Sequence, residues 1–346
     1  MNRVNIKRLD RPRLAAELTA LGEPRHRLDQ IWRWIWGKGA VSFEEMSNLP
    51  RDLRRRLDAR MSIPRLEIAG SVSSPADGSQ KFLFACANGT VIETVLMTTG
   101  GHFTVCVSSQ AGCPLACTFC RTGTGGYERD LAVDEILDQI LIPRTASIPP
   151  RTRYNVVFMG MGEPLLNMAG LTAALEILND QSAFGLREKR ITVSTIGLPD
   201  RIAELARGRL RFGLAVSLNA ATDEVRRRLM PAAAGIEETL AAAETFARAR
   251  RTRTTLEYVL IAGVNDSPEQ ARRLAALTKG RPFKINLIPF NEWPGCPLRR
   301  PGEQAHERFI RLLLPEAPAV TVRRSQGGDI GAACGQLKAD RIDYGL

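Results

Sequence analysis

The sequence CPLACTFCRTGTGG occupies residues 113–126 and contains three closely spaced thiols, Cys113, Cys117 and Cys120. Spacers of three and then two residues let these thiols converge on one metal centre. A tetrahedral zinc site would need a fourth ligand, and the nearest other cysteine is Cys106. Three cysteines on a cubane iron–sulfur cluster leave one iron without a protein ligand, and a small molecule can bind there. The stretch therefore favours an iron–sulfur cluster that takes part in chemistry.

Two other interpretations of the triplet stay open at this point. The cysteines can be structural residues, or they can bind a zinc ion whose fourth ligand comes from a distant part of the chain. With Phe119 directly before the last cysteine, the spacing resembles the signature of the radical S-adenosylmethionine (SAM) superfamily. The resemblance implies that the open iron of a 4Fe–4S cluster binds SAM, and that reductive cleavage of SAM yields a 5′-deoxyadenosyl radical.

The composition describes a chain larger than one typical domain. With 346 residues, 44% of them hydrophobic, we expect one large barrel plus an accessory unit. No apolar run approaches the roughly 18 residues that span a bilayer, and the first residues lack a signal-peptide pattern. Seven cysteines without an export signal favour reduced thiols, metal ligands or catalysis over a disulfide framework. The sequence predicts a soluble, cytoplasmic protein that does not bind membranes.

The charge balance is strongly basic. The formal net charge is +11, from 48 Lys and Arg against 37 Asp and Glu. A basic surface favours a polyanionic partner through counterion release, and nucleic acid is the commonest such partner. An arginine-rich composition inherited from a GC-rich genome explains the same excess. Charge alone therefore supports an RNA partner without establishing one.

Residues 1–65 are predicted to form a small helical domain that binds RNA. Apolar residues recur at helical spacing over 28–35, and a second helix is expected over 51–61. A phosphate-binding face and an ordinary solvated helix surface are both consistent with its arginines. These arginines are Arg25, Arg33, Arg51, Arg54, Arg55 and Arg56.

Residues 66–100 are predicted to form a β-hairpin extension that links this domain to the rest of the chain. Asp77-Gly78 and Asn88-Gly89 are hairpin turn signals between apolar runs. Glu93 interrupts the second of these runs. A buried carboxylate costs stability unless it is paired or used, whereas on an alternating strand the side chain can face solvent. Both interpretations of Glu93 stay open.

Strand-like and helix-like segments alternate over residues 101–346, which is typical of a parallel sheet. We expect an α/β fold in which six strand–helix units form a partial TIM-like barrel, with its active site at the carboxyl ends of the strands. The expected strands are 103–108, 154–159, 190–195, 212–218, 254–261 and 282–288, with a further strand at 319–323. Expected helices include 133–142, 171–179, 224–229 and 268–277.

Glycines and polar residues follow the carboxyl ends of several of these strands. They are therefore expected at the same rim of the sheet as the cysteine triplet, which follows the first strand. Singly each is an ordinary turn residue, but together they suit an adenosyl amino acid. The glycines let the backbone approach a ligand, a carboxylate can hold an amine, and hydroxyls and amides can bind a ribose, a carboxylate and a purine edge. The residues are Gly160, Gly162, Glu163, Ser194, Ser217, Asn219 and Asn291.

Two further cysteines attract attention. Cys334 lies in a loop of small residues near the end of the chain, where no helix or strand pattern requires it, so a reactive thiol is favoured. Cys106 lies on the first strand of the barrel, and from the sequence alone a core residue is the better interpretation. Cys86 and Cys296 are also assigned to the core.

Six motifs and the amino-terminal segments together resemble the RlmN family. Members of this family are dual-specificity methyltransferases of carbon 2 of adenine in bacterial 23S rRNA and tRNA. The amino-terminal segments are LDQIWRWIWGKG and FEEMSNLP. The motifs are TVCVSSQAGCPLACTFC, VVFMGMGEPLLN, ITVST, AVSLNA, INLIPFNEWPG and DIGAACGQL.

The resemblance implies a role for each unusual residue. One SAM methylates Cys334, and a second SAM on the cluster of Cys113, Cys117 and Cys120 gives the radical that activates this methyl group. Cys106 then releases the product by forming a disulfide with Cys334, and Glu93 accepts the proton from carbon 2. The family also implies a flavodoxin- or ferredoxin-type electron donor and a monomer. The SAM-contacting positions by match are Gly162, Glu163, Ser194, Ser217, Leu218, Asn219 and Asn291.

Some features leave alternatives open. A Cfr-type enzyme uses the same two cysteines to methylate carbon 8 of adenine. A radical SAM enzyme that activates another protein, and an iron–sulfur RNA-binding module, are more distant rivals. Two positions depart from the family pattern: Asn219 stands where many members carry histidine, and residues 230–235 replace a stretch that is usually basic and aromatic.

Overall fold

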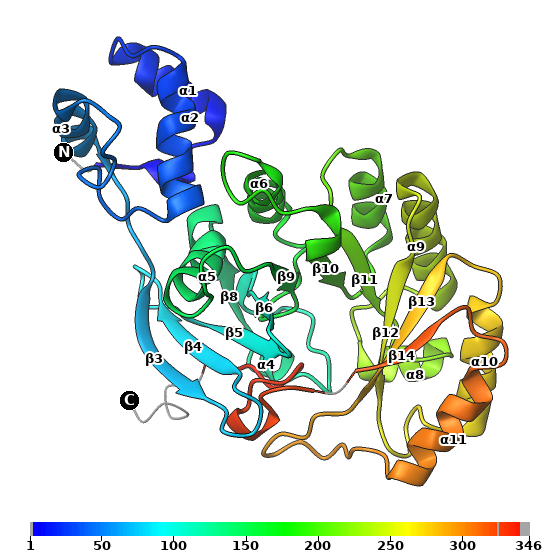
Figure 1. The fold of residues 1–346 in the computed structure, drawn as a ribbon. Helices are drawn as coiled ribbons and strands as arrows, with labels where there is room; N and C mark the ends of the chain where they lie inside the picture. Colours follow the sequence, from blue (N-terminus) through cyan, green and yellow to red (C-terminus); the bar gives the residue numbers. More distant parts are fainter. Residues whose placement is uncertain (1–2, 324, 340–346) are drawn as a thin grey trace.

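The computed structural model describes residues 3–323 and 325–339, and one large sheet dominates it. Within these residues the sheet holds ten strands in the order β14-β13-β12-β11-β10-β9-β6-β5-β4-β3. The strands from β14 to β6 in this order pair in parallel (Figure 1). They are β6 (His102–Cys106), β9 (Tyr154–Phe158), β10 (Ile191–Thr195), β11 (Gly213–Ser217), β12 (Thr254–Leu260), β13 (Phe283–Pro289) and β14 (Val320–Val322).

Each parallel strand ends within two residues of the position expected from the sequence. Helices follow the strands and bury their apolar faces against the sheet. In one of them Leu171, Leu175 and Leu178 recur at helical spacing and are fully buried. The expected α/β class is confirmed. The helices are α5 (Val133–Ala146), α6 (Met168–Asn179), α7 (Pro199–Arg207), α8 (Asp223–Leu229), α9 (Ile236–Arg250), α10 (Pro268–Thr278) and α11 (Glu303–Leu313).

The segment that the sequence suggests as a hairpin extension forms one edge of this same sheet. Strands β3 (Glu67–Ser73), β4 (Gln80–Ala85) and β5 (Val91–Thr99) pair antiparallel in sequence, and β5 pairs antiparallel with β6. In this register Val95 lies opposite Cys106. Strand β5 therefore brings Glu93 to the carboxyl end of β6, which is where the cysteine loop begins.

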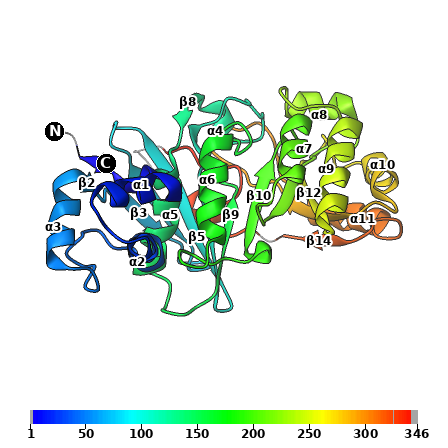
Figure 2. The ribbon, with the colours of Figure 1, turned by 90° about the horizontal axis from the view of Figure 1, so that it is seen from above.

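The amino-terminal helices form a unit that packs directly on the barrel. Lys7 makes a buried ion pair with Asp138 of α5, and the fully buried Trp36 lies against the ring of Phe184. Figure 2 shows this unit beside α5. Its helical segments are α1 (Arg11–Ala20), α2 (His26–Trp32), a continuing turn at Arg33–Lys38, and α3 (Arg51–Arg60).

The chain after β14 returns across the carboxyl ends of the strands. In Figure 1 this red segment lies on the far side of the molecule from the blue amino-terminal helices. It reaches the short helix α4 (Arg121–Thr124), which follows the cysteine triplet. Among the residues that the structure describes, no helix is long and apolar enough to cross a bilayer.

Candidate active site

The cysteine loop is closed by a short antiparallel pair of strands. Strand β7 (Gln110–Gly112) precedes the loop, and β8 (Tyr127–Asp130) follows it. A side chain at Gly112 would place its Cβ 2.1 Å from the carbonyl oxygen of Gly126, and Gly112 also has a positive φ of 75°. Only glycine permits this closure. The loop is therefore held between two fixed ends beyond the carboxyl end of β6.

The three thiols of the loop are partly buried, at Cys113, Cys117 and Cys120. Burial raises the pKa of Cys113 to about 12, because a thiolate loses its hydration there. Backbone N–H groups act in the opposite direction, with that of Leu115 donating to Cys113 and that of Gly123 to Cys120. Iron replaces the thiol proton when it binds. Buried thiols that face N–H donors fit the role of cluster ligands.

The placement of these thiols also bears on the zinc alternative. The sulfurs of one tetrahedral zinc site lie about 3.8 Å apart, because each is about 2.3 Å from the ion. The thiolates of a cubane cluster bind three different irons and do not need to approach one another so closely. In the described parts of the chain, no three His, Cys, Asp or Glu side chains are arranged to hold one metal ion. Among these residues, the zinc alternative therefore has no preformed set of ligands.

The glycines after β9 allow the chain to pack against itself. A Cβ on Gly160 would lie 2.7 Å from the carbonyl oxygen of Val107, and one on Gly162 would lie 2.5 Å from the Cβ of Gln110. Gly162 also has a φ of 97°. The sequence predicts that these glycines leave room for a ligand. In the structure they also leave room for the segment after β6, which packs against them. This packing carries Glu163 to the cysteine loop.

Glu163 joins the loop after β9 to the end of β10. Its carboxylate accepts hydrogen bonds from the N–H groups of Leu165 (3.0 Å) and Ile196 (2.8 Å). Burial raises its pKa to about 7, although these hydrogen bonds act against the rise. Its negative charge adds to the rise in the pKa of Cys113 and of Cys117. The carboxylate is thus fixed near the cysteine loop, where a ligand amine is expected.

The residues at the ends of β10 and β11 that are predicted to bind a ligand differ in how far their side chains are buried. Ser194 and Ser217 are half-buried on neighbouring strands. The Leu218 side chain is fully buried in the core, and its backbone N–H donates to the carbonyl oxygen of Glu257 (2.9 Å). Asn219 has a φ of 56°, in the left-handed region that asparagine tolerates. Its side-chain oxygen accepts a hydrogen bond from the N–H of Val259 (2.8 Å), so this amide is engaged inside the protein.

Arg226 is a site residue that the sequence analysis missed. Its side chain is 1% exposed, and its guanidinium donates to the carbonyl oxygens of Ser217 (2.9 Å), Leu218 (2.6 Å) and Ile196 (2.8 Å). Its Nε donates to the carbonyl oxygen of Ala234 (2.8 Å), within the stretch that departs from the family pattern. One buried cation therefore fixes the ends of β10 and β11 and the loop beneath them.

Replacing Arg226 with methionine is expected to weaken SAM binding and to lower stability. Several buried carbonyl groups would lose their donors, which costs on the order of 3 kcal/mol or more. The measurements are thermal unfolding and equilibrium dialysis with SAM. The matched control is Arg227→Met on the exposed side of the same helix, where no comparable change is expected. Unchanged SAM affinity in Arg226→Met would show that the arginine does not shape the rim.

The segment that carries Cys334 is clamped to the cysteine loop, to the loop after β13 and to strand β5. The links to the cysteine loop and to β5 join parts of the chain that are more than 200 residues apart. The tail cysteine is therefore placed beside the cysteine loop by hydrogen bonds on both sides. The contacts run from Asn291 Nδ2 to Cys334 O (3.0 Å), Arg121 N to Gly335 O (2.8 Å), Thr122 Oγ1 to Leu337 O (2.5 Å) and Lys338 N to Glu93 Oε2 (2.8 Å).

Cys106 and Cys334 line one small cavity together with Arg323. Burial raises the pKa of Cys106 to about 12, the neighbouring Cys334 adds to the rise, and Arg323 acts against it. The Arg323 guanidinium also contacts the sulfur atoms of Met159 (3.6 Å) and Met97 (3.9 Å). No local pattern in the sequence points to a buried cation beside these two thiols. The arrangement can stabilise negative charge on either sulfur.

Glu93 is fully buried, so the interpretation that it faces solvent is wrong. Its Oε1 lies 3.0 Å from Nζ of Lys81, which is itself 1% exposed. Its backbone carbonyl accepts a hydrogen bond from the Ser108 hydroxyl (2.6 Å). A buried carboxylate of this kind requires a cationic partner. Lys81 supplies it from the neighbouring strand, and Glu93 stays within reach of the tail through Lys338.

The arginines of the amino-terminal unit are only partly available to a partner. Arg54 pairs with Glu44 (3.1 Å), and Arg56 pairs with Asp52 (2.8 Å). Such internal pairs compensate part of the charge that the sequence assigns to a phosphate-binding face. Much of the uncompensated positive charge of the molecule therefore lies outside this unit.

Comparison with known proteins identifies the family. Family models match the radical SAM superfamily over residues 107–275 and the N-terminal domain of ribosomal RNA large subunit methyltransferases over 4–63. A radical SAM methyltransferase crystal structure from Sphaerobacter thermophilus aligns with a TM-score of 0.91 and 39% identity, over 97% of this chain and 100% of its own. The dual-specificity RNA methyltransferase RlmN of Geotalea uraniireducens is 42% identical, over 99% of this chain and 98% of its own. The chain belongs to the RlmN family.

The RlmN protein of Geobacter sulfurreducens is also 42% identical, over 97% of this chain and 92% of its own length. This member of the RlmN family is accordingly a SAM-dependent RNA methyltransferase of the radical SAM type. Proteins of this superfamily use a 4Fe–4S cluster and SAM.

Proposed function

We propose that this enzyme methylates carbon 2 of adenine in 23S rRNA and in tRNA, next to the anticodon, through a methyl group carried on Cys334. One observation carries the proposal: Cys106 and Cys334 share a cavity directly beside the cysteine loop. An ordinary methyl transfer from SAM needs no protein thiol at all. Two thiols at the mouth of a radical SAM barrel indicate a covalent route.

The cofactors would be held by residues at the carboxyl rim. Cys113, Cys117 and Cys120 would ligate the cluster, and its fourth iron would be left for SAM. When bound, the cluster and SAM supply a 5′-deoxyadenosyl radical. A flavodoxin- or ferredoxin-type donor would provide the electron, and the enzyme is expected to act as a monomer in the cytoplasm. The SAM-binding residues are proposed to be Gly162, Glu163, Ser194, Ser217, Leu218, Asn219 and Asn291.

Cys334 is the residue that would carry the methyl group. Its thiolate would attack the methyl carbon of one SAM and become S-methylcysteine, with S-adenosylhomocysteine as the leaving group. Asn291 holds the backbone carbonyl of Cys334, and Arg121 holds that of Gly335. These hydrogen bonds keep the sulfur next to the cysteine loop. A methyl group on Cys334 would therefore lie between the cluster site and an incoming base, as hydrogen abstraction from it requires.

Glu93 would accept the proton that leaves carbon 2. The carbon–hydrogen bond at carbon 2 must break after the new carbon–carbon bond forms, and a base has to stand near the tail at that moment. Glu93 meets this condition because its Oε2 already accepts the N–H of Lys338 (2.8 Å). The ammonium group of Lys81 balances the carboxylate charge inside the protein.

Cys106 would complete the reaction by attacking the sulfur of Cys334. A disulfide would form between the two cysteines as the bond between the Cys334 sulfur and the linking methylene carbon breaks; the electron pair leaves with that carbon, which takes up a proton and becomes the methyl group of the base. The two thiols are then oxidised, so a reductant must restore them before the next turnover. Arg323 lies beside both sulfurs and can stabilise the attacking thiolate.

The test is mass spectrometry of nucleosides from RNA that the purified, cluster-loaded enzyme has modified. We expect 2-methyladenosine in 23S rRNA and in tRNA. Finding 8-methyladenosine instead would assign the Cfr-type reaction, which uses the same pair of thiols. RNA incubated with enzyme but without a reductant is the control, because the radical route requires an electron and no product is expected there.

A further inference from the structure

A broad groove lies on the rim of the sheet opposite the cysteines. Its walls are formed by the segments that precede the four neighbouring parallel strands β9, β10, β11 and β12. The cysteine loop and Cys334 lie at the carboxyl ends of the strands, so the groove is separated from them by the length of the barrel. Its volume of about 1700 Å³ exceeds the roughly 300–1,000 Å³ of a small-molecule pocket. A groove of this size fits part of a macromolecule.

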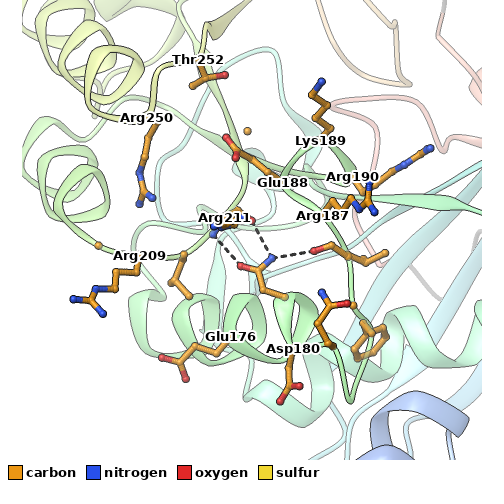
Figure 3. Close-up of a pocket in the computed structure, with 18 of the residues that line it drawn as sticks. Glu176, Asp180, Arg187, Glu188, Lys189, Arg190, Arg209, Arg211, Arg250 and Thr252 are labelled. Carbon is orange, nitrogen blue, oxygen red and sulfur yellow. Dashed lines mark hydrogen bonds between the residues drawn. The ribbon is translucent and has the colours of Figure 1, made fainter.

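The groove is strongly cationic. Eight basic side chains and three carboxylates line it, and one of the carboxylates, Asp180, is paired with Arg11 outside the groove (2.8 Å). Among the described residues, no ion pair joins any of the eight cations to a carboxylate. Figure 3 labels Arg187, Lys189, Arg190, Arg209, Arg211 and Arg250 around the groove. The basic residues are Arg153, Arg187, Lys189, Arg190, Arg209, Arg211, Arg250 and Arg251.

The two walls are held at a fixed separation by Asn179 at the end of α6. Its Nδ2 donates to the carbonyl oxygens of Leu186 (3.3 Å) and Arg211 (3.0 Å), and its Oδ1 accepts the N–H of Arg211 (2.9 Å). Figure 3 draws these bonds as dashed lines beside Arg211. The cations at Arg187 and Arg211 are thereby presented from a preorganised backbone, which lowers the entropic cost of binding an anion.

The groove also continues from the amino-terminal unit. The wall at residues 180–185 packs on this unit through the ring contact of Phe184 with Trp36 and the ion pair of Asp180 with Arg11. An RNA that contacts the amino-terminal unit would reach the groove without leaving the protein surface. A concave site whose arginines form no ion pair with any described carboxylate suits a phosphate backbone, whereas a bilayer surface is too flat to enter it.

We infer that this groove binds the phosphate backbone of the substrate RNA at a place remote from the target adenine. The inference rests on the activity of the chain on RNA, and it adds a second contact region on the opposite rim of the barrel. The target base cannot occupy the groove and meet Cys334 at once. The groove therefore serves large folded RNAs, which can contact both rims, and does not serve a short hairpin that carries only the target loop.

The inference is tested with the triple variant Arg187→Gln, Lys189→Gln and Arg211→Gln. All three side chains are exposed, and binding is measured by fluorescence anisotropy over a range of salt concentrations. For full-length tRNA we expect affinity to fall roughly 10- to 100-fold at physiological salt, and the slope of log K against log salt to become less steep by about 2 to 3. For a short anticodon hairpin we expect no change beyond that of the control.

The matched control removes the same charge from α10 and α11, as Arg272→Gln, Arg308→Gln and Arg311→Gln, which are also exposed. Equal losses in the two variants would reduce the effect to general charge and overturn the inference, and so would unchanged tRNA affinity in the groove variant. Binding is measured without turnover. Failure of the carbon 2 assignment would therefore leave the binding result intact, and loss of the groove effect would leave the methylated product unchanged.

Discussion

Replacing Cys334 with alanine abolishes RNA methylation, with an expected loss of at least ~10³-fold. No methyl carrier remains in the variant, and the radical generated at the cysteine loop has no methyl group to activate. The fold is expected to persist, because the contacts that clamp this part of the tail use backbone carbonyl groups of Cys334 and Gly335. Methyl incorporation from labelled SAM into RNA measures the loss.

The control for this variant is Cys86→Ala. Cys86 is buried at the end of the β4 hairpin, away from the cavity of Cys106 and Cys334. This variant should keep its activity. Iron content and the visible absorption of the reconstituted cluster should be the same in both variants, which separates loss of the carrier from loss of the cluster. Methylation by Cys334→Ala at the native rate would overturn the two-cysteine route.

The sequence was sufficient to predict the barrel, because strand and helix periods alternate with little ambiguity. Buried parallel strands are continuous apolar runs, and several of their carboxyl ends are marked by a glycine or polar residue. The same regularity placed Glu163, Ser194 and Asn291 at one rim. It also identified Cys86 and Cys296 as core residues, and the structure shows both buried.

Partners across the sheet could not be predicted in the same way. Lys81 appears in the sequence as one charged residue at the start of a strand, and only the β4–β5 register brings it to Glu93. Arg226 is the first of three consecutive arginines, and nothing local distinguishes it from its exposed neighbours. Both are buried cations whose partners lie in other elements. Contacts of this kind depend on tertiary structure and leave no periodic signal.

Cys106 shows the same limit most clearly. Within its strand it has the pattern of a core residue, and by burial it is one, at 6% exposed. Its chemistry depends on a loop more than 200 residues later, which places Cys334 and Arg323 in the same cavity. Family resemblance supplied the pairing in the sequence analysis, and the structure supplies the proximity that the pairing requires.

Replacing Cys106 with alanine is expected to trap RNA on the protein. The variant can still methylate Cys334 and join it to adenine, but no thiol remains to attack the Cys334 sulfur and release the product. A covalent protein–RNA species should accumulate to about one RNA per active chain. It is detected as a slowly migrating band on a denaturing gel and as a nucleotide adduct on Cys334 by mass spectrometry. The substitution removes one sulfur atom from a buried site, so the fold should remain.

The double variant Cys106→Ala, Cys334→Ala is the decisive control, because it lacks the site of attachment. It should give no band, and treatment of the single variant with ribonuclease should collapse its band to the mobility of the free protein. Release of methylated RNA by Cys106→Ala at the native rate, with no trapped species, would mean that the thiol beside Arg323 has another role. The trapped species would also order the steps, because carbon–carbon bond formation must precede the attack of Cys106 for any adduct to accumulate.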